Sequence, residues 1–76
     1  MDVKAVGQRI KAARERKNMT QEDLAALIDI SPAHISVIER GTKIPRIDTF
    51  VAIANALGVS ADELLVDVVD LSLIHI

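Results

Sequence analysis

Apolar residues along this chain of 76 residues recur at spacings of three and four, which is the pattern of one face of an α-helix. They form five short groups, separated by residues that cap helices or make turns. None of the groups alternates strictly between apolar and polar positions, as a half-buried strand would. The pattern therefore predicts an all-α fold, a compact bundle of five short helices in a single domain.

Capping residues mark the boundaries of these helices. Thr20, Ser31 and Ser60 stand where the second, third and fifth helices begin, because a side-chain oxygen can accept from the free amides of a first turn. The fourth helix is expected over about residues 46–57. Its apolar stripe consists of Ile47, Phe50, Val51, Ala54 and Leu57. The residues that follow or close the first four helices are Asn18, Asp29, Gly41 and Gly58.

The second and third predicted helices are joined by a turn of about three to four residues, which is the geometry of a helix-turn-helix. Ala25 is small where the two helices would cross closely, so a larger side chain there would push them apart. Asp29 lies at the tight turn, where we expect a positive φ, as after the first helix at Asn18. The segment 21–40 is therefore expected to carry the function.

Charge is distributed unevenly along the chain. All nine lysine and arginine residues lie within residues 1–46 beside six acidic residues, whereas residues 47–76 hold five acidic residues and none that is basic. The first part is thus +3 and the second −5, which together make the net charge of −2. This asymmetry indicates a side that faces a polyanion, and charge alone leaves a mixed solvated surface open as the alternative.

What the chain lacks excludes several classes of function. Without cysteine it has no disulfide, thiolate zinc site or cysteine nucleophile, and His34 and His75 are too few for a histidine metal cluster. Phe50 is the single aromatic residue, so no stacking platform for single-stranded nucleic acid is expected. No apolar run approaches the length of a membrane span, and no nucleophile, base and orienting residue form a set. We therefore expect a cytoplasmic protein that is not an enzyme, with no cofactor, no metal and no membrane partner.

The sequence of the central segment is more informative than helical spacing alone. The runs TQEDLAALIDISPAHISVIERG and KIPRIDTFVAIANALGVSADELL together resemble the helix-turn-helix domain of the phage Cro and repressor family, the XRE family. The resemblance spans roughly Val6 to Leu65, and its most specific pieces are Leu24-Ala25, Ile38 to Gly41 and Ala56 to Ser60. It implies a repressor-like, sequence-specific regulator of transcription that binds double-stranded DNA and is encoded by a bacterium or a phage.

The resemblance also implies roles for particular residues. It places the recognition helix, at about residues 31–40, in the major groove, with the second helix crossing the DNA backbone. Arg14 and Glu39 resemble a family pair that fixes the orientation of the recognition helix, and two unrelated surface charges are the alternative. The base-facing positions are Pro32, Ala33, His34, Ser36 and Val37. The positions that face the DNA backbone are Gln21, Arg14, Arg40, Lys43 and Arg46.

The implied recognition face is poor in residues that read bases. It has no arginine, asparagine or glutamine for bidentate contacts with guanine or adenine. Ala33 and Val37 suit thymine methyl groups, and His34 can donate to a guanine acceptor. Specificity is therefore expected to depend partly on DNA shape or bridging water. Two alternatives stay open: an antitoxin-like or other protein-interaction module on the same scaffold, and the DNA-targeting domain of a longer regulator.

In this family the surface around the fourth and fifth helices commonly joins two copies. In the present sequence that surface would use Val59, Leu64, Leu65 and Val66. So small a patch predicts a weak homodimer that forms with the help of DNA.

The end of the chain has a separate interpretation. We expect a DNA-binding domain over residues 1–66 and a tail over residues 67–76. The last six residues, LSLIHI at 71–76, resemble the translation of a transposon-end adapter used in sequencing libraries, and a native tail for dimerisation is the alternative. If the adapter interpretation holds, the natural protein continues past Asp70.

Overall fold

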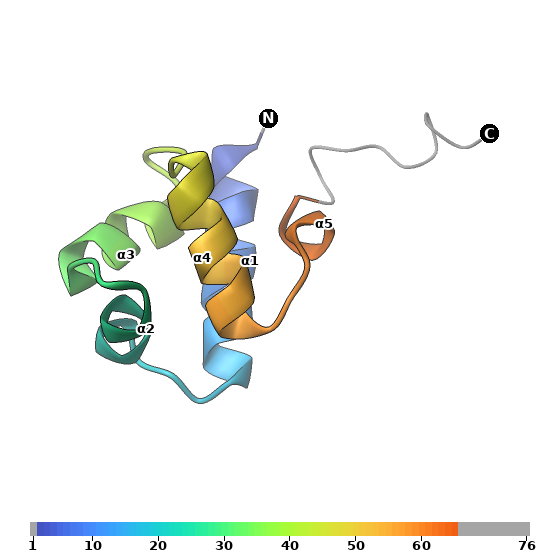
Figure 1. Cartoon of the computed structure of the whole chain (residues 1–76). Coiled ribbons are helices and arrows are strands. Elements are labelled where there is room, and N and C mark those ends of the chain that lie inside the picture. Colours follow the sequence, from blue (N-terminus) through green and yellow to red (C-terminus); the bar gives the residue numbers. More distant parts are fainter. Residues whose placement is uncertain (1, 66–76) are drawn as a thin grey trace.

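The computed structural model describes residues 2–65, and in this part of the chain all regular structure is helical (Figure 1). This confirms the predicted all-α fold of five short helices. The predicted tail, with its suspected adapter segment at residues 71–76, lies outside the described residues. The helices are α1 (Val3–Arg16), α2 (Gln21–Ile28), α3 (Pro32–Arg40), α4 (Ile47–Leu57) and α5 (Ala61–Leu64).

The expected caps are in place. The Oγ1 atom of Thr20 accepts a hydrogen bond from the amide of Asp23 at 3.0 Å, and the Asp23 carboxylate accepts one from the amide of Thr20 at 2.9 Å. Ser31 and Ser60 likewise accept from the amides three residues further on, at 3.1 and 3.2 Å. Arg46 is the N-cap of α4, so this helix begins one residue later than expected.

Backbone geometry confirms the expected turn residues. Asn18 and Asp29 have positive φ angles of 57° and 60°, and among residues 2–65 no other residue except glycine has one. Asp29 is the C-cap of α2, and its amide donates to the carbonyl of Ala25. Its left-handed conformation turns the chain so sharply that α3 begins only three residues later.

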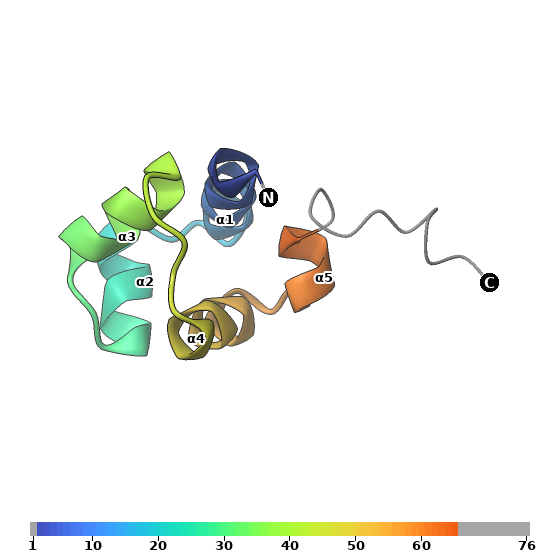
Figure 2. The same cartoon turned by 90° about the horizontal axis from the view of Figure 1, so that it is seen from above.

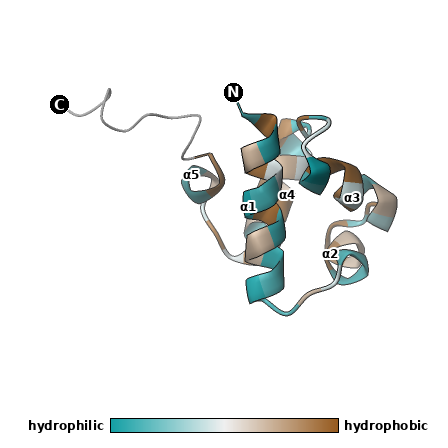
Figure 3. Ribbon diagram, turned by 180° about the vertical axis from the view of Figure 1, so that it is seen from behind, coloured by the Kyte–Doolittle hydropathy of each residue, from teal (hydrophilic) through white to brown (hydrophobic). Residues whose placement is uncertain are grey.

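The core lies between α1 and α4, with α2 and α3 on one side and α5 on the other (Figure 2). Helical spacing directs the apolar stripes of these elements inward, and along α1 hydrophilic residues alternate with apolar ones (Figure 3). Aliphatic side chains therefore supply most of the hydrophobic stabilisation. The largest fully buried ones are Ile10, Leu24, Ile35, Ile53, Leu57 and Leu64.

Ala25 is buried in this core, with 1% of its surface exposed, on the helix that packs against α3. We expect Ala25→Leu to lower the free energy of unfolding by about 1–3 kcal/mol, because extra methylene groups cannot fit a close helix crossing without displacing it. The next residue, Ala26, is exposed. Ala26→Leu is therefore the matched control, with an expected change within about 0.5 kcal/mol. Thermal unfolding measures both variants, and equal melting temperatures would argue against a close crossing at Ala25.

Candidate nucleic-acid interface

The outer face of α3 contains the residues expected to meet DNA bases. Ile35, Ile38 and Glu39 of this helix point into the protein and are buried. On the other side, the structure leaves the remaining positions accessible. Three of the expected base-facing residues, Pro32, Ala33 and His34, are exposed, and the other two, Ser36 and Val37, are half-buried.

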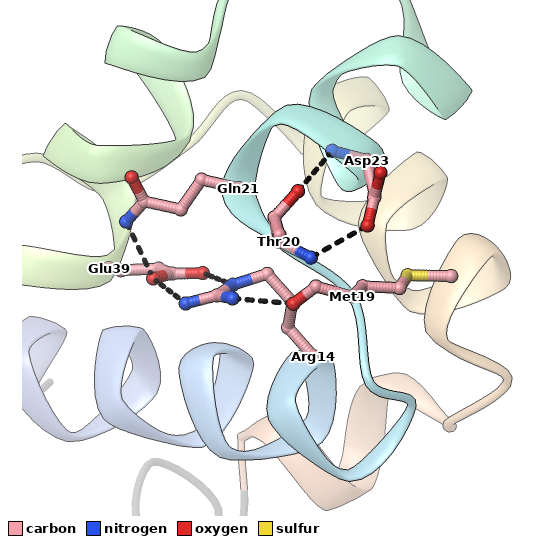
Figure 4. A network of polar contacts seen from close by, with 6 residues as sticks. All are labelled: Arg14, Met19, Thr20, Gln21, Asp23 and Glu39. Atoms are coloured by element: carbon pink, nitrogen blue, oxygen red, sulfur yellow. Dashed lines mark hydrogen bonds and ion pairs between the residues drawn. The ribbon is translucent and has the colours of Figure 1, made fainter.

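One network of polar side chains ties three helices together (Figure 4). Arg14 of α1 donates two hydrogen bonds to Glu39 of α3, from Nε to Oε2 at 2.7 Å and from Nη2 to Oε1 at 3.0 Å. The Nη1 atom of Arg14 donates to the carbonyl of Met19 at 2.7 Å. From α2, Gln21 Nε2 donates to Glu39 Oε1 at 3.1 Å. The predicted ion pair therefore forms, and it holds α1, α2 and α3 in one arrangement.

This pair is buried and fully satisfied. Arg14 is 7% exposed and Glu39 6%, and no buried side-chain nitrogen or oxygen among residues 2–65 lacks a hydrogen-bond partner. The hydrogen bond to Glu39 raises the pKa of Arg14, an effect that outweighs the opposing cost of desolvation. Because this pKa is strongly alkaline even in water, the guanidinium is charged at any ordinary pH. The alternative of two unrelated surface charges is wrong.

Burial also changes the interpretation of two residues that were expected to face the DNA backbone. Arg14 engages its Nε, Nη1 and Nη2 atoms within the protein, so its main role here is to orient α3. Gln21 is half-buried, and its carbonyl oxygen points away from Glu39 in Figure 4. Contact of either residue with phosphate stays a prediction.

The other three residues expected at the DNA backbone, Arg40, Lys43 and Arg46, are all exposed, as a phosphate-facing edge requires. Arg40 and Lys43 form no ion pair with any residue that the structure describes. The guanidinium of Arg46 lies 3.5 Å from the carboxylate of Asp48, measured from Nη2 to Oδ2. Positive charge at the end of α3 is therefore largely uncompensated.

Two further cations were not singled out from the sequence. Lys4 and Lys11 of α1 line one surface hollow together with Arg40, beside the end of α3. The sequence places both lysines on the outer face of the first helix. Only the tertiary structure brings that face next to Arg40 and so extends the cationic edge.

Two glycines allow α1 to lie directly against the end of α3. A Cβ atom on Gly7 would come within 2.6 Å of the carbonyl oxygens of Ile38 and Glu39. A Cβ atom on Gly41 would collide with the backbone of Lys4, and Gly41 also has a positive φ of 71°. These close approaches place the last turn of α3, and Arg40 with it, at a fixed position on α1.

The structure corrects one residue of the expected dimer surface. Leu64 is 2% exposed and belongs to the core, so its side chain is not available to a second copy. The four-residue helix α5 folds back against α1, where Arg9 Nη1 donates to the carbonyl of Leu64 at 3.4 Å. Val59 and Leu65 are half-buried against the core. Val66 lies outside the described residues.

Two further features are absent from the part of the chain that the structure describes. Between residues 2 and 65 no three histidine, cysteine, aspartate or glutamate side chains come together as a metal site would require. None of the five helices is long and apolar enough to cross a membrane.

The arrangement matches a known family. The sequence model of the helix-turn-helix family matches residues 10–64 of this chain. The chain belongs to this family. Among solved structures, the restriction-modification controller protein C.AhdI from Aeromonas hydrophila is similar to this helix-turn-helix chain with a TM-score of 0.79 and 30% identity, over 83% of this chain and 96% of that one. The P22 c2 repressor in complex with a synthetic operator has a TM-score of 0.74 and 32% identity, over 78% of this chain and 89% of that one.

Two relatives show how much of a helix-turn-helix protein this chain represents. The immunity repressor of Bacillus phage phi105 is 43% identical over 54 residues, which are 71% of this chain but 38% of the repressor. The uncharacterized HTH-type transcriptional regulator YazB of Bacillus subtilis is 39% identical over 64 residues, which are 84% of this chain and 93% of YazB. The chain thus spans nearly all of one relative and about two fifths of the other.

Proposed function

We propose that this helix-turn-helix protein regulates transcription by binding double-stranded DNA, with α3 in the major groove. One observation carries the proposal: beside the exposed face of α3 stand the exposed cations Arg40 and Lys43, which pair with no acidic residue among residues 2–65, and a buried ion pair locks this helix to α1. The relatives support it, since they include an immunity repressor, and P22 c2 was solved in complex with a synthetic operator.

In this proposal, phosphate contacts give affinity and register, and base contacts give specificity. The cations at the end of α3 meet the phosphates. Ala33 and Val37 contact thymine methyl groups, His34 donates to a guanine acceptor, and DNA shape supplies the remaining discrimination. Bound protein blocks or recruits the transcription machinery, without catalysis.

Loss of a phosphate contact should weaken binding to every duplex about equally. We expect Arg40→Ala and Lys43→Ala each to do so, and each to lower the slope of log K against log salt by about one unit. Lys17→Ala is the matched control, because Lys17 is exposed at the far end of α1 beside Gly58. Fluorescence anisotropy with a random-sequence duplex over a salt series measures all three variants.

Each contrary result of this experiment has a definite meaning. A variant that altered sequence preference and kept the wild-type salt slope would be a base reader. A wild-type chain that failed to bind any duplex at low salt would reject the proposal. It would favour the antitoxin-like protein-interaction module, for which the shortage of base-reading side chains on α3 is the supporting observation.

We also infer that the protein acts as a homodimer in the cytoplasm, on bacterial or phage DNA. Two copies would place their recognition helices in successive major grooves, about 34–36 Å apart. Because the chain spans 38% of the phi105 immunity repressor, the DNA-targeting domain of a longer regulator is a further form of the same proposal.

A further inference from the structure

Two surface hollows beside α3 contain cations. One lies where the end of α3 meets α1 (Figure 2), and its lining includes Lys4, Lys11 and Arg40. We call it the α1 hollow. The other lies between α3 and the loop that leads to α4, with Lys43 and Arg46 in its lining, and we call it the loop hollow. The proposed phosphate contacts use the cations of the loop and Arg40, and they leave the two lysines of α1 without a role.

The two hollows flank the exposed face of α3. Successive side chains of a helix point in directions about 100° apart, and the buried residues of α3 share one side of it. Glu39 and Arg40 line the α1 hollow. His34, Val37 and Ile38 line the loop hollow. These two sets point about 80° to either side of the exposed face, so the hollows lie on opposite flanks of the face that is expected to meet bases.

The charges of the α1 hollow are mainly positive. Lys4 and Lys11 are exposed and lie about two turns apart, with the uncharged Gln8 between them. Neither lysine forms an ion pair with any residue between positions 2 and 65. Among the described residues of the lining, the one acidic residue is Glu39, whose charge is balanced within the buried ion pair. With Arg40, the hollow therefore presents three cations that can meet an anion.

The spread of these cations suits a polymer backbone better than a small anion. Lys4 and Lys11 are separated along α1 by about 10 Å, which corresponds to about three nucleotides of one DNA strand. All three cations are exposed, so they form an open strip and not a closed cage around one ion. The strip ends at Glu15, the next residue on this side of α1, which is acidic and exposed.

We propose that the α1 hollow binds backbone phosphates of the same DNA duplex that receives α3. This inference rests on the proposed function and extends it from α3 and the loop to α1. A helix in the major groove, which is about 12 Å wide, lies between two phosphate backbones. Lys43 and Arg46 stand on the flank that faces one backbone. Lys4 and Lys11 stand on the flank that faces the other, so the duplex is held from both sides of α3.

Removal of the two lysines tests the proposal. In fluorescence anisotropy with the random-sequence duplex, the double variant Lys4→Ala, Lys11→Ala should lower the slope of log K against log salt by about two units, one for each phosphate contact. The double variant Lys4→Arg, Lys11→Arg keeps both charges and should retain the wild-type slope. Arg16→Ala is the control, because Arg16 is exposed on α1 but lines a different hollow, beside α5. A wild-type slope in the double alanine variant would overturn the proposal.

A gain of charge tests the same site in the opposite direction. Gln8→Lys adds a cation between the two lysines and should steepen the slope by about one unit. A steeper slope cannot result from a poorly folded variant, so this experiment is independent of any effect on stability. Ala12→Lys is the matched control, because Ala12 is exposed on α1 and lines the hollow beside α5. If both variants steepened the slope equally, net charge would explain the effect and the proposal would be wrong.

The outcomes separate this inference from the proposed function. If Arg40→Ala and Lys43→Ala weaken binding while the variants of Lys4, Gln8 and Lys11 keep the wild-type slope, then α3 and the loop bind DNA and α1 does not. A wild-type chain that binds no duplex at low salt would refute the proposed DNA binding, and this inference with it.

Discussion

Gly41→Ala is expected to lower the free energy of unfolding by about 2–5 kcal/mol. The left-handed conformation at this position, with φ at 71°, costs alanine about 1–2 kcal/mol. The new Cβ atom would also collide with the backbone of Lys4, which adds an overpacking cost of about 1–3 kcal/mol. Small domains are stable by only about 5–15 kcal/mol in total, so urea unfolding should show a large shift of the midpoint.

Gly58→Ala separates the two contributions. Gly58 has nearly the same backbone conformation, with φ at 67°, but its nearest neighbour is the flexible end of Lys17, whose Nζ lies 3.3 Å from an added Cβ. We therefore expect only the conformational cost of about 1–2 kcal/mol at this position. If the two variants were equally unstable, the close approach of α1 to the end of α3 would not exist in solution.

Arg14→Met is expected to cost about 3–5 kcal/mol, because it leaves the carboxylate of Glu39 buried without its charged partner. It also removes the donor to the carbonyl of Met19. The pKa of Arg14 is higher in the folded chain than in the unfolded one, so its stabilisation is complete below the unfolded pKa. It would be lost only as the pH rises through the folded value, far above neutrality. The free energy of unfolding that Arg14→Met loses relative to the wild type, measured by urea unfolding, should therefore be the same throughout the neutral pH range.

Two further variants make this prediction specific. Arg46→Ala breaks the exposed pair with Asp48 and should change the free energy of unfolding by less than about 1 kcal/mol. Combining Arg14→Met with Glu39→Leu removes both buried charges and should restore most of the lost stability. A single Arg14→Met variant no less stable than Arg46→Ala would show that the buried network does not hold the three helices together.

The positions of the helices and their caps were determined by the sequence itself. The capping boxes at Thr20 and Ser60 and the positive φ at Asp29 depend on residues within three or four positions of each other. Such local interactions can be inferred from the order of residues alone. For this reason the five helices of residues 2–65 and the helix-turn-helix were predicted correctly, and α3 and α4 each begin one residue later than expected.

The site could be predicted only in part. Arg14 and Glu39 are 25 positions apart, and their pairing was inferred because the chain resembles a family, not from the spacing. The sequence pointed to the exposed cations after α3. It did not show that Gln21 completes the buried network or that Lys4 and Lys11 lie beside Arg40.

Only the tertiary structure decided which apolar residues are covered. The stripe expected on α4 contained Ile47 and Val51 beside Phe50, yet the two aliphatic residues are exposed and the phenylalanine is buried. Leu64, expected at the surface, lies in the core. The physical reason is that helical periodicity specifies which residues share a face, whereas burial depends on which other helix lies against that face. Those contacts join segments far apart in the chain, and their formation depends on close approaches such as that of Gly7 to α3.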